Sequence, residues 1–139
     1  MNFAQIILPL NLKGTFTYKV SAEIVDNIEI GMRVLVPFGG KKIYTGIVFE
    51  LHHQAPENFE PKEIISLLDQ FPILPKEQIR FWKWLSSYYF GNLGEIYRFA
   101  FPSSLKLESE TYLKLKSGAI IEFENLDVNE MYLIQALEV

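Results

Sequence analysis

The sequence predicts an α+β protein whose first part is a small, mostly antiparallel, β-barrel-like domain of about five strands with two capping helices. Two observations lead to this prediction. Up to residue 68, short runs of β-branched and aromatic residues alternate with segments rich in proline, glycine and polar residues, which is the pattern of strands joined by turns. After Pro75, apolar residues recur at three- and four-residue intervals, which is the period of a helix. With 139 residues, 49% of them hydrophobic, the chain is long enough to build a core.

The predicted strands cover residues 3–8, 15–20, 33–37, 43–51 and 62–68. The first is stopped by Pro9, and the second alternates aromatic and polar side chains, so that one of its faces is buried and the other meets solvent or a ligand. The last segment fits either a strand or a short helix. We predict a strand, because the segment is short and lies between Pro61 and Pro72.

Two helices are predicted after the strands, at residues 76–89 and at about residues 93–101. The first presents a broad apolar face and ends near Gly91. Its aromatic residues are of the kind that stacks on bases, but their helical spacing favours packing in the core: Trp82, Trp84, Tyr88 and Tyr89. Gly46 lies inside a strand, where a glycine predicts a bulge or close packing.

The sequence pattern changes near residue 107. We therefore predict a first domain at residues 1–106 and the start of a second at residues 107–139. A hairpin is predicted within residues 111–123. Asp127, followed by Glu130, has the form of a capping box for a further helix. Since no stop signal follows that helix, we expect the chain to be the front of something longer.

The net charge of −4 at first argues against a nucleic-acid partner, but its distribution changes that conclusion. Residues 1–106 hold eleven Lys and Arg against ten Asp and Glu, whereas residues 107–139 hold two Lys against seven acidic residues. The acidity therefore belongs to the tail, and a local basic site in the first part stays open. Without a membrane-length apolar run, a signal peptide or any cysteine, we expect a soluble, cytoplasmic protein with no disulfide and no thiolate metal site.

Motifs for catalysis are absent from the sequence. There is no phosphate-binding G-x-x-x-x-G-K-[ST] loop and no G-x-S-x-G nucleophile turn, and the carboxylates are scattered. His52 and His53 are adjacent, so on a strand they point to opposite faces and cannot readily bind one metal; we expect both to be solvated loop residues. By itself, this chain is not expected to be an enzyme or to hold a cofactor or metal.

One predicted hairpin turn, Phe-Gly-Gly-Lys-Lys at residues 38–42, carries an unusual set of residues. Taken alone, it fits a flexible tip with lysines that confer solubility. The alternative is that the two glycines expose backbone amides to an anionic or planar ligand and the two lysines attract it. In a small barrel, Phe16 can lie at the same end as this turn, and an aromatic platform beside a basic rim is how small barrels hold single-stranded nucleic acid.

A series of short motifs runs through most of the chain: Phe16-Thr17-Tyr18, Gly31 to Gly39, Thr45 to Val48, Lys62 to Ile65, Leu68-Asp69, Pro72 to Pro75, Trp84 to Tyr89, Gly94-Glu95 and Ala100 to Pro102. Their order and spacing over about 100 residues resemble the amino terminus of the PriA family of replication-restart helicases, also called primosomal protein N′. Beyond residue 106 the resemblance is faint, and there the family begins its winged-helix domain. The resemblance therefore implies the start of a winged-helix-like domain in residues 107–139.

In that family the first domain binds the 3′ end of the nascent leading strand at a stalled replication fork. The resemblance implies a pocket for the terminal nucleotide formed by Phe16, Thr17, Gly39 and Lys62. It leaves Lys41 and Lys42 as candidate phosphate contacts. The family usually has an aspartate where this chain has Thr17, and a neutral hydroxyl accepts a hydrogen bond from a 3′ hydroxyl less strongly than a carboxylate does.

For the longer protein, the resemblance implies an ATP-dependent 3′-to-5′ DNA helicase that reloads the replicative helicase. ATP, Mg²⁺ and cysteine-ligated zinc would be bound beyond residue 139. Forked DNA, primosome proteins and single-strand binding protein are the implied partners, and the nucleoid of a bacterial cytoplasm is the implied location. The alternative function is a protein-interaction β-barrel, in which the 38–42 turn docks a partner protein without end-specific DNA binding.

Overall fold

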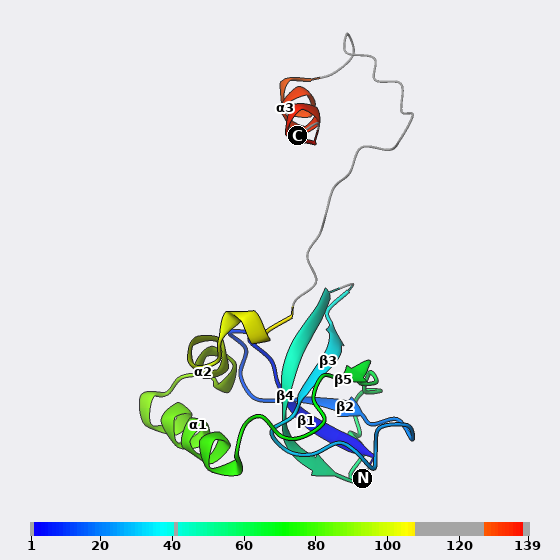
Figure 1. Cartoon of the computed structure of the whole chain (residues 1–139), viewed down its shortest axis with the longest axis vertical. Coiled ribbons are helices and arrows are strands. Elements are labelled where there is room, and N and C mark those ends of the chain that lie inside the picture. The colour runs from blue at the N-terminus through cyan, green and yellow to red at the C-terminus, as the bar shows by residue number, and fades with distance from the viewer. Residues whose placement is uncertain (1, 41, 108–126, 138–139) are drawn as a thin grey trace. The chain divides into compact units, whose positions relative to one another are not determined.

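The computed structural model describes residues 2–40, 42–107 and 127–137, which belong to two compact units, residues 1–109 and 110–139. In the first unit, five strands form one antiparallel sheet (Figure 1). The strands are β1 (Phe3–Ile7), β2 (Phe16–Lys19), β3 (Arg33–Phe38), β4 (Lys42–His52) and β5 (Ser66–Leu67), in the spatial order β2-β1-β4-β3-β5. The predicted α+β class and the first four strands are confirmed, whereas β5 covers only two residues of the strand predicted at 62–68.

The predicted barrel is wrong, because the sheet stays open with β2 and β5 as its edges. The segment that precedes β5 divides its backbone hydrogen bonds between two strands. The N–H of Lys19 at the end of β2 donates to the carbonyl of Lys62 at 2.9 Å, and the N–H of Ile65 donates to Leu35 of β3 at 2.8 Å. In the described part of the chain, a single isolated bridge, between Lys19 and Glu63, joins β2 to this segment. A barrel needs a continuous ladder between its first and last strands, and one bridge does not supply it.

The long strand β4 lies at the centre of the sheet and is buried on both faces. Val48 packs on one face among apolar side chains of β1, β2 and β3, whereas Ile47 packs on the other face. Gly46 lies so close to β1 that a Cβ atom there would collide with the side chain of Ile6. The close packing predicted at Gly46 is therefore confirmed.

Two helices, α1 (Lys76–Tyr89) and α2 (Leu93–Ala100), pack against the Ile47 face of the sheet and are followed by the 3₁₀ helix η1 (Ser103–Leu105) (Figure 1). Both helices begin where the sequence predicted. Trp82 and Tyr97 are the largest buried side chains of this layer. The core position predicted for the other three aromatics of α1 is wrong, because their side chains are 54% to 70% exposed: Trp84, Tyr88 and Tyr89. A helix on the surface of a sheet buries one stripe only, and Ile79 and Trp82 occupy that stripe.

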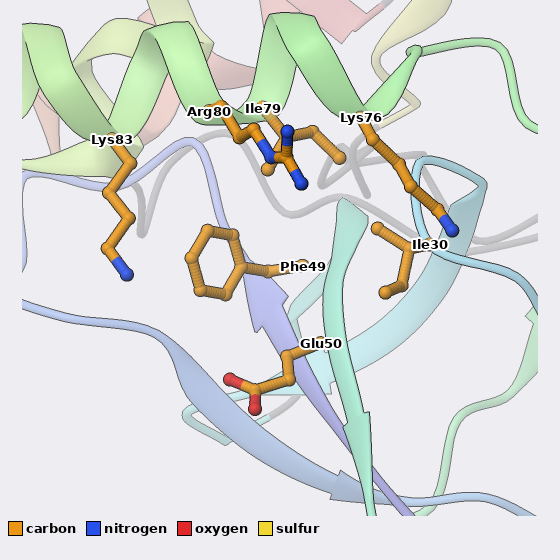
Figure 2. A pocket seen from close by; sticks show the side chains of 7 residues that line it. All are labelled: Ile30, Phe49, Glu50, Lys76, Ile79, Arg80 and Lys83. Atoms are coloured by element: carbon orange, nitrogen blue, oxygen red, sulfur yellow. The ribbon is translucent and has the colours of Figure 1, made fainter.

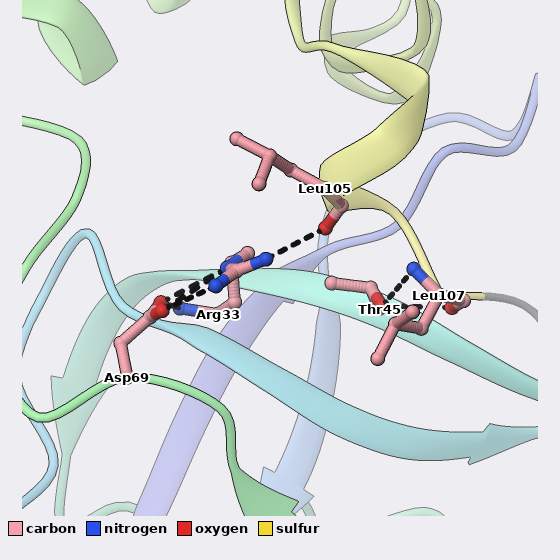
Figure 3. A network of polar contacts seen from close by, with 5 residues as sticks. All are labelled: Arg33, Thr45, Asp69, Leu105 and Leu107. Carbon is pink, nitrogen blue, oxygen red and sulfur yellow. Dashed lines mark hydrogen bonds and ion pairs between the residues drawn. The ribbon is translucent and has the colours of Figure 1, made fainter.

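A polar network ties the end of the first unit to the sheet (Figure 3). The Arg33 guanidinium donates to both carboxylate oxygens of Asp69, at 2.6 to 3.2 Å, and to the carbonyl of Leu105 at 3.0 Å. These hydrogen bonds to Asp69 raise the pKa of Arg33 above its ordinary value, so the guanidinium stays protonated. The buried hydroxyl of Thr45 both donates to the carbonyl of Leu107 and accepts from its N–H, each at 2.7 Å.

The second unit contains α3 (Val128–Leu137). The capping box predicted at its start is confirmed, because Asp127 Oδ1 accepts from the N–H of Glu130 at 2.9 Å and Glu130 Oε2 accepts from the N–H of Asp127 at 3.0 Å. The hairpin predicted within residues 111–123 lies outside the described residues.

Candidate nucleic-acid interface

A pocket of about 510 Å³ opens beside the β3–β4 turn. Its lining residues come from β2, from the end of β3 and from the segment before β5: Thr15, Phe16, Thr17, Tyr18, Pro37, Phe38, Gly39, Phe59, Glu60 and Lys62. The structure therefore brings together all four residues that the family resemblance implied for one pocket, Phe16, Thr17, Gly39 and Lys62. Lys42 lies on β4 and does not line the pocket, and Lys41 lies outside the described residues.

Gly39 and Lys62 define the cationic side of the pocket. Gly39 has a positive φ of 65°, a conformation that side chains with a Cβ rarely adopt, and a Cβ built there would meet nothing within 4 Å. The backbone at the turn is therefore open to an incoming group. The ammonium of Lys62 donates to the carbonyl of Gly39 at 2.8 Å. This bond holds the positive charge beside the exposed backbone and leaves two of its N–H groups for a ligand.

Aromatic rings form the apolar side of the pocket. Phe16 and Phe38 meet edge to face, with ring centroids 4.8 Å apart, and Phe38 meets Tyr44 in the same way at 6.3 Å. Phe16 is half-buried and rests on this cluster, so its position is fixed. Phe59 also lines the pocket and is 56% exposed. Because a nucleobase has two apolar faces, one fixed ring and one exposed ring suit it well.

Thr17 belongs to a row of polar side chains on β1, β2 and β4. Its hydroxyl oxygen accepts from the side-chain amide of Gln5 at 2.9 Å, and the carbonyl oxygen of the same amide accepts from Thr15 at 3.0 Å. The amide nitrogen of Gln5 also lies 3.2 Å from Nε2 of His52. Thr17 thus keeps its hydroxyl hydrogen and one lone pair for a ligand.

The structure places His52 differently from the sequence prediction and adds Gln5, for which there was none. His52 lies on β4 and is half-buried against Gln5, so the prediction that it is a solvated loop residue is wrong; His53 is exposed. Gln5 was not singled out by sequence reasoning. Its role depends on the register in which β1 pairs with β2, where Gln5 faces Thr17, and no local sequence signal sets that register.

Tyr18, on the same strand, was also missed as a pocket residue. Its side chain is only 3% exposed, and its hydroxyl donates to the carbonyl of Pro37 at 3.1 Å. Burial raises the pKa of Tyr18 to about 12. Alternation along β2 does predict an inward-facing side chain here, but the reach of its hydroxyl to the β3–β4 turn is a property of the tertiary structure.

The buried Tyr18 hydroxyl makes stability depend on pH in the alkaline range. Because the pKa rises from 10.0 to about 12 on folding, the contribution of neutral Tyr18 is complete below pH 10 and is lost as the pH rises from 10 to 12. We expect the free energy of unfolding of the wild type to fall, over this range, by about 1–2 kcal/mol more than that of Tyr18→Phe. Urea denaturation at pH 9 and pH 11.5 measures the difference, and parallel pH dependences of the two proteins would contradict it.

Aromatic surface beside a fixed cation, on a small antiparallel sheet, is typical of modules that bind single-stranded nucleic acid or its ends, and this is the class that the fold and pocket define. The chain belongs to the PriA 3′ DNA-binding domain family, whose model, described as "3'DNA-binding domain (3'BD)", matches residues 5–102. The family resemblance seen in the sequence is thereby confirmed, and the chain is a DNA-binding module of the replication-restart type.

Curated relatives agree with this assignment. The chain is 32% identical over 122 residues to the replication restart protein PriA of Bacillus subtilis, and the aligned part covers 86% of the chain and 15% of that protein. It is 32% identical over 123 residues to PriA of Rickettsia conorii (86% and 17%) and 31% identical over 107 residues to PriA of Haemophilus influenzae (76% and 14%). The chain therefore spans about one sixth of the length of these relatives.

The described part of the chain contains no group of three or more His, Cys, Asp or Glu residues placed to hold a metal ion. Within the same residues, no helix has the length and apolar character that crossing a membrane requires.

Proposed function

We propose that this chain captures the 3′ end of the nascent leading strand at a stalled replication fork, with the terminal nucleotide in the pocket beside the β3–β4 turn. The observation that carries the proposal is the convergence, in this pocket, of the exposed backbone at Gly39, the Lys62 ammonium bound to it, and the fixed ring of Phe16.

Each of the four residues has a distinct role in this proposal. Phe16 offers apolar surface to the terminal base or sugar. Gly39 lets the nucleotide approach the backbone, and Lys62 reaches a base edge or a phosphate. Thr17 meets the 3′ hydroxyl with the lone pair and hydrogen that Gln5 leaves free. Lys41 and Lys42 contact backbone phosphates of the DNA.

For the longer protein we propose the activity of an ATP-dependent 3′-to-5′ DNA helicase that restarts replication in a bacterial cytoplasm, associated with the nucleoid. ATP, Mg²⁺ and zinc would then be bound by later domains, and primosome proteins and single-strand binding protein would be its partners. Residues from 107 onward would begin a winged-helix-like domain. The family membership of the chain supports these proposals.

Fluorescence anisotropy with matched forks tests the proposal for this chain. One fork carries a 3′ hydroxyl at the junction end of the nascent leading strand, one carries a 3′ phosphate there, and one lacks the nascent strand. We expect the first to bind most tightly. Equal affinity for all three would contradict end recognition and favour the alternative, a protein-interaction domain.

Substitutions at Thr17 test how the hydroxyl is sensed. We expect Thr17→Asp to sharpen the preference for a 3′ hydroxyl over a 3′ phosphate by about 1 kcal/mol, or roughly fivefold. The added carboxylate accepts more strongly from the hydroxyl and repels a terminal phosphate, so both effects have the same sign. Thr17→Val keeps the shape but removes the hydroxyl, and it should erode the preference. If all three proteins discriminate equally in anisotropy titrations, sensing runs through the backbone near Phe16 and Gly39 instead.

A further inference from the structure

A second pocket, of about 480 Å³, lies on the opposite side of the sheet, between α1 and the end of β4 (Figure 2). Its floor is apolar, formed by Ile30, Phe49 and Ile79. Its rim is basic, because three side chains descend into it from one side of α1: Lys76, Arg80 and Lys83. Their spacing of four and then three residues places them on one helix face.

The strand β4 is distorted where it meets this pocket. Gln5 of β1 pairs with Glu50, but the next residue, Ile6, pairs with Val48, so that Phe49 is an additional residue in β4. Such a bulge redirects the side chains around it. Phe49 and Glu50 both line the pocket, although consecutive residues of a regular strand point to opposite faces. The bulge therefore shapes this pocket, in which the ammonium nitrogen of Lys83 lies 5.9 Å from the centroid of the Phe49 ring.

In the part of the chain that the structure describes, the three cations of the pocket form no ion pair, and one carboxylate, that of Glu50, lines the pocket with them. Among the described residues, the ion pairs within 4 Å join Lys19 to Glu63 and Arg33 to Asp69, and neither involves the three cations of α1. Glu50 lines the pocket without forming an ion pair with any of them. Three exposed cations above an apolar floor match one sugar-phosphate unit, with the phosphate at the rim and the deoxyribose on the floor.

We propose that this pocket binds a backbone phosphate of the fork's DNA, several nucleotides away from the 3′ end. The inference rests on the proposed end-binding function, which supplies the DNA. Phe49 lies seven residues along β4 from Lys42 at the turn, which is about 23 Å at the rise of a strand. It packs on the face of the sheet that the helices cover, whereas Phe16 and Phe38 of the first pocket pack on the opposite face. In duplex DNA, which has one phosphate per roughly 3.4 Å of each strand, a distance of about 23 Å corresponds to about seven nucleotides beyond the terminal one.

The test compares a double substitution with a control of equal charge. Arg80→Gln/Lys83→Gln removes two cations from the pocket, and Lys13→Gln/Arg98→Gln removes two from elsewhere. Two DNA probes are titrated by anisotropy: a fork with 20-base-pair arms and a trinucleotide with a 3′ hydroxyl. We expect the pocket variant to bind the fork about tenfold more weakly at low salt, and the slope of log affinity against log salt to become shallower by about 1. We expect the control variant to stay within about twofold of the wild type on the fork, and both variants to bind the trinucleotide as the wild type does.

Each other outcome overturns the inference in a recognisable way. If both variants bind the fork equally well, the pocket makes no contact with DNA. If the pocket variant also loses trinucleotide binding in proportion, its effect is transmitted to the end site and no separate phosphate contact exists. The proposed function is tested separately by the wild type, since a wild type without preference for a 3′ hydroxyl would contradict end recognition whatever the variants do.

Discussion

Asp69→Ala is expected to lower the free energy of unfolding by about 3–5 kcal/mol. The Asp69 side chain is 6% exposed, and the Arg33 side chain that it neutralises is 16% exposed. Asp69 also accepts from the backbone N–H of Arg33 at 2.8 Å, and so replaces a partner that a longer β5 would have supplied. The substitution removes the counter-ion of a largely buried guanidinium, which keeps its bond to the carbonyl of Leu105, and it leaves the N–H of residue 33 without its acceptor. Urea denaturation measures the loss.

Arg33→Met is the matched control for that experiment. It removes the guanidinium but leaves Asp69 bound to the N–H of residue 33, so its cost should be smaller than that of Asp69→Ala. It also removes the bond to the carbonyl of Leu105. If Asp69→Ala costs less than about 1 kcal/mol, the Arg33–Asp69 pair in Figure 3 contributes no more than an exposed ion pair does, and the prediction is wrong.

Lys62→Met is expected to weaken binding of DNA with a free 3′ end by about ten- to hundredfold. A hydrogen bond from a charged donor contributes about 1.5–3 kcal/mol, and methionine keeps the apolar stem while removing the ammonium. The fold should be unaffected, since the side chain is exposed and the backbone of Lys62 keeps its bond to Lys19. Anisotropy with the 3′-hydroxyl fork measures the loss.

Lys19→Met provides the comparison for Lys62. Lys19 is exposed and paired with Glu63 at 3.3 Å, it lies next to the same segment, and it does not line the pocket. The substitution Lys19→Met removes one positive charge, as Lys62→Met does. Because Lys19 does not line the pocket, we expect its loss to change the affinity by less than about threefold. Equal losses in the two variants would show that only the overall charge matters and that Lys62 has no specific contact with the DNA end.

The elements of this protein that the sequence predicted well are those with strong local signals. The helix α1 begins after Pro75 and the capping box at Asp127 starts α3, because both signals act within a single helical turn. The β3–β4 hairpin follows from two apolar runs around a turn with glycines. The family resemblance predicted which four residues line the pocket, because it carries evolutionary information that composition and periodicity lack.

What the sequence by itself determined is the α+β class and the position of most elements, and its resemblance to the family named the four residues that line the pocket at the turn. Only the tertiary structure decided that the sheet stays open, that Trp84 and Tyr88 are exposed, and that Gln5 holds Thr17. The physical reason is the same in each case. A local pattern specifies which residues are apolar and how they are spaced, whereas strand register, the closure of a sheet and the stripe that a helix buries depend on segments far apart in the chain.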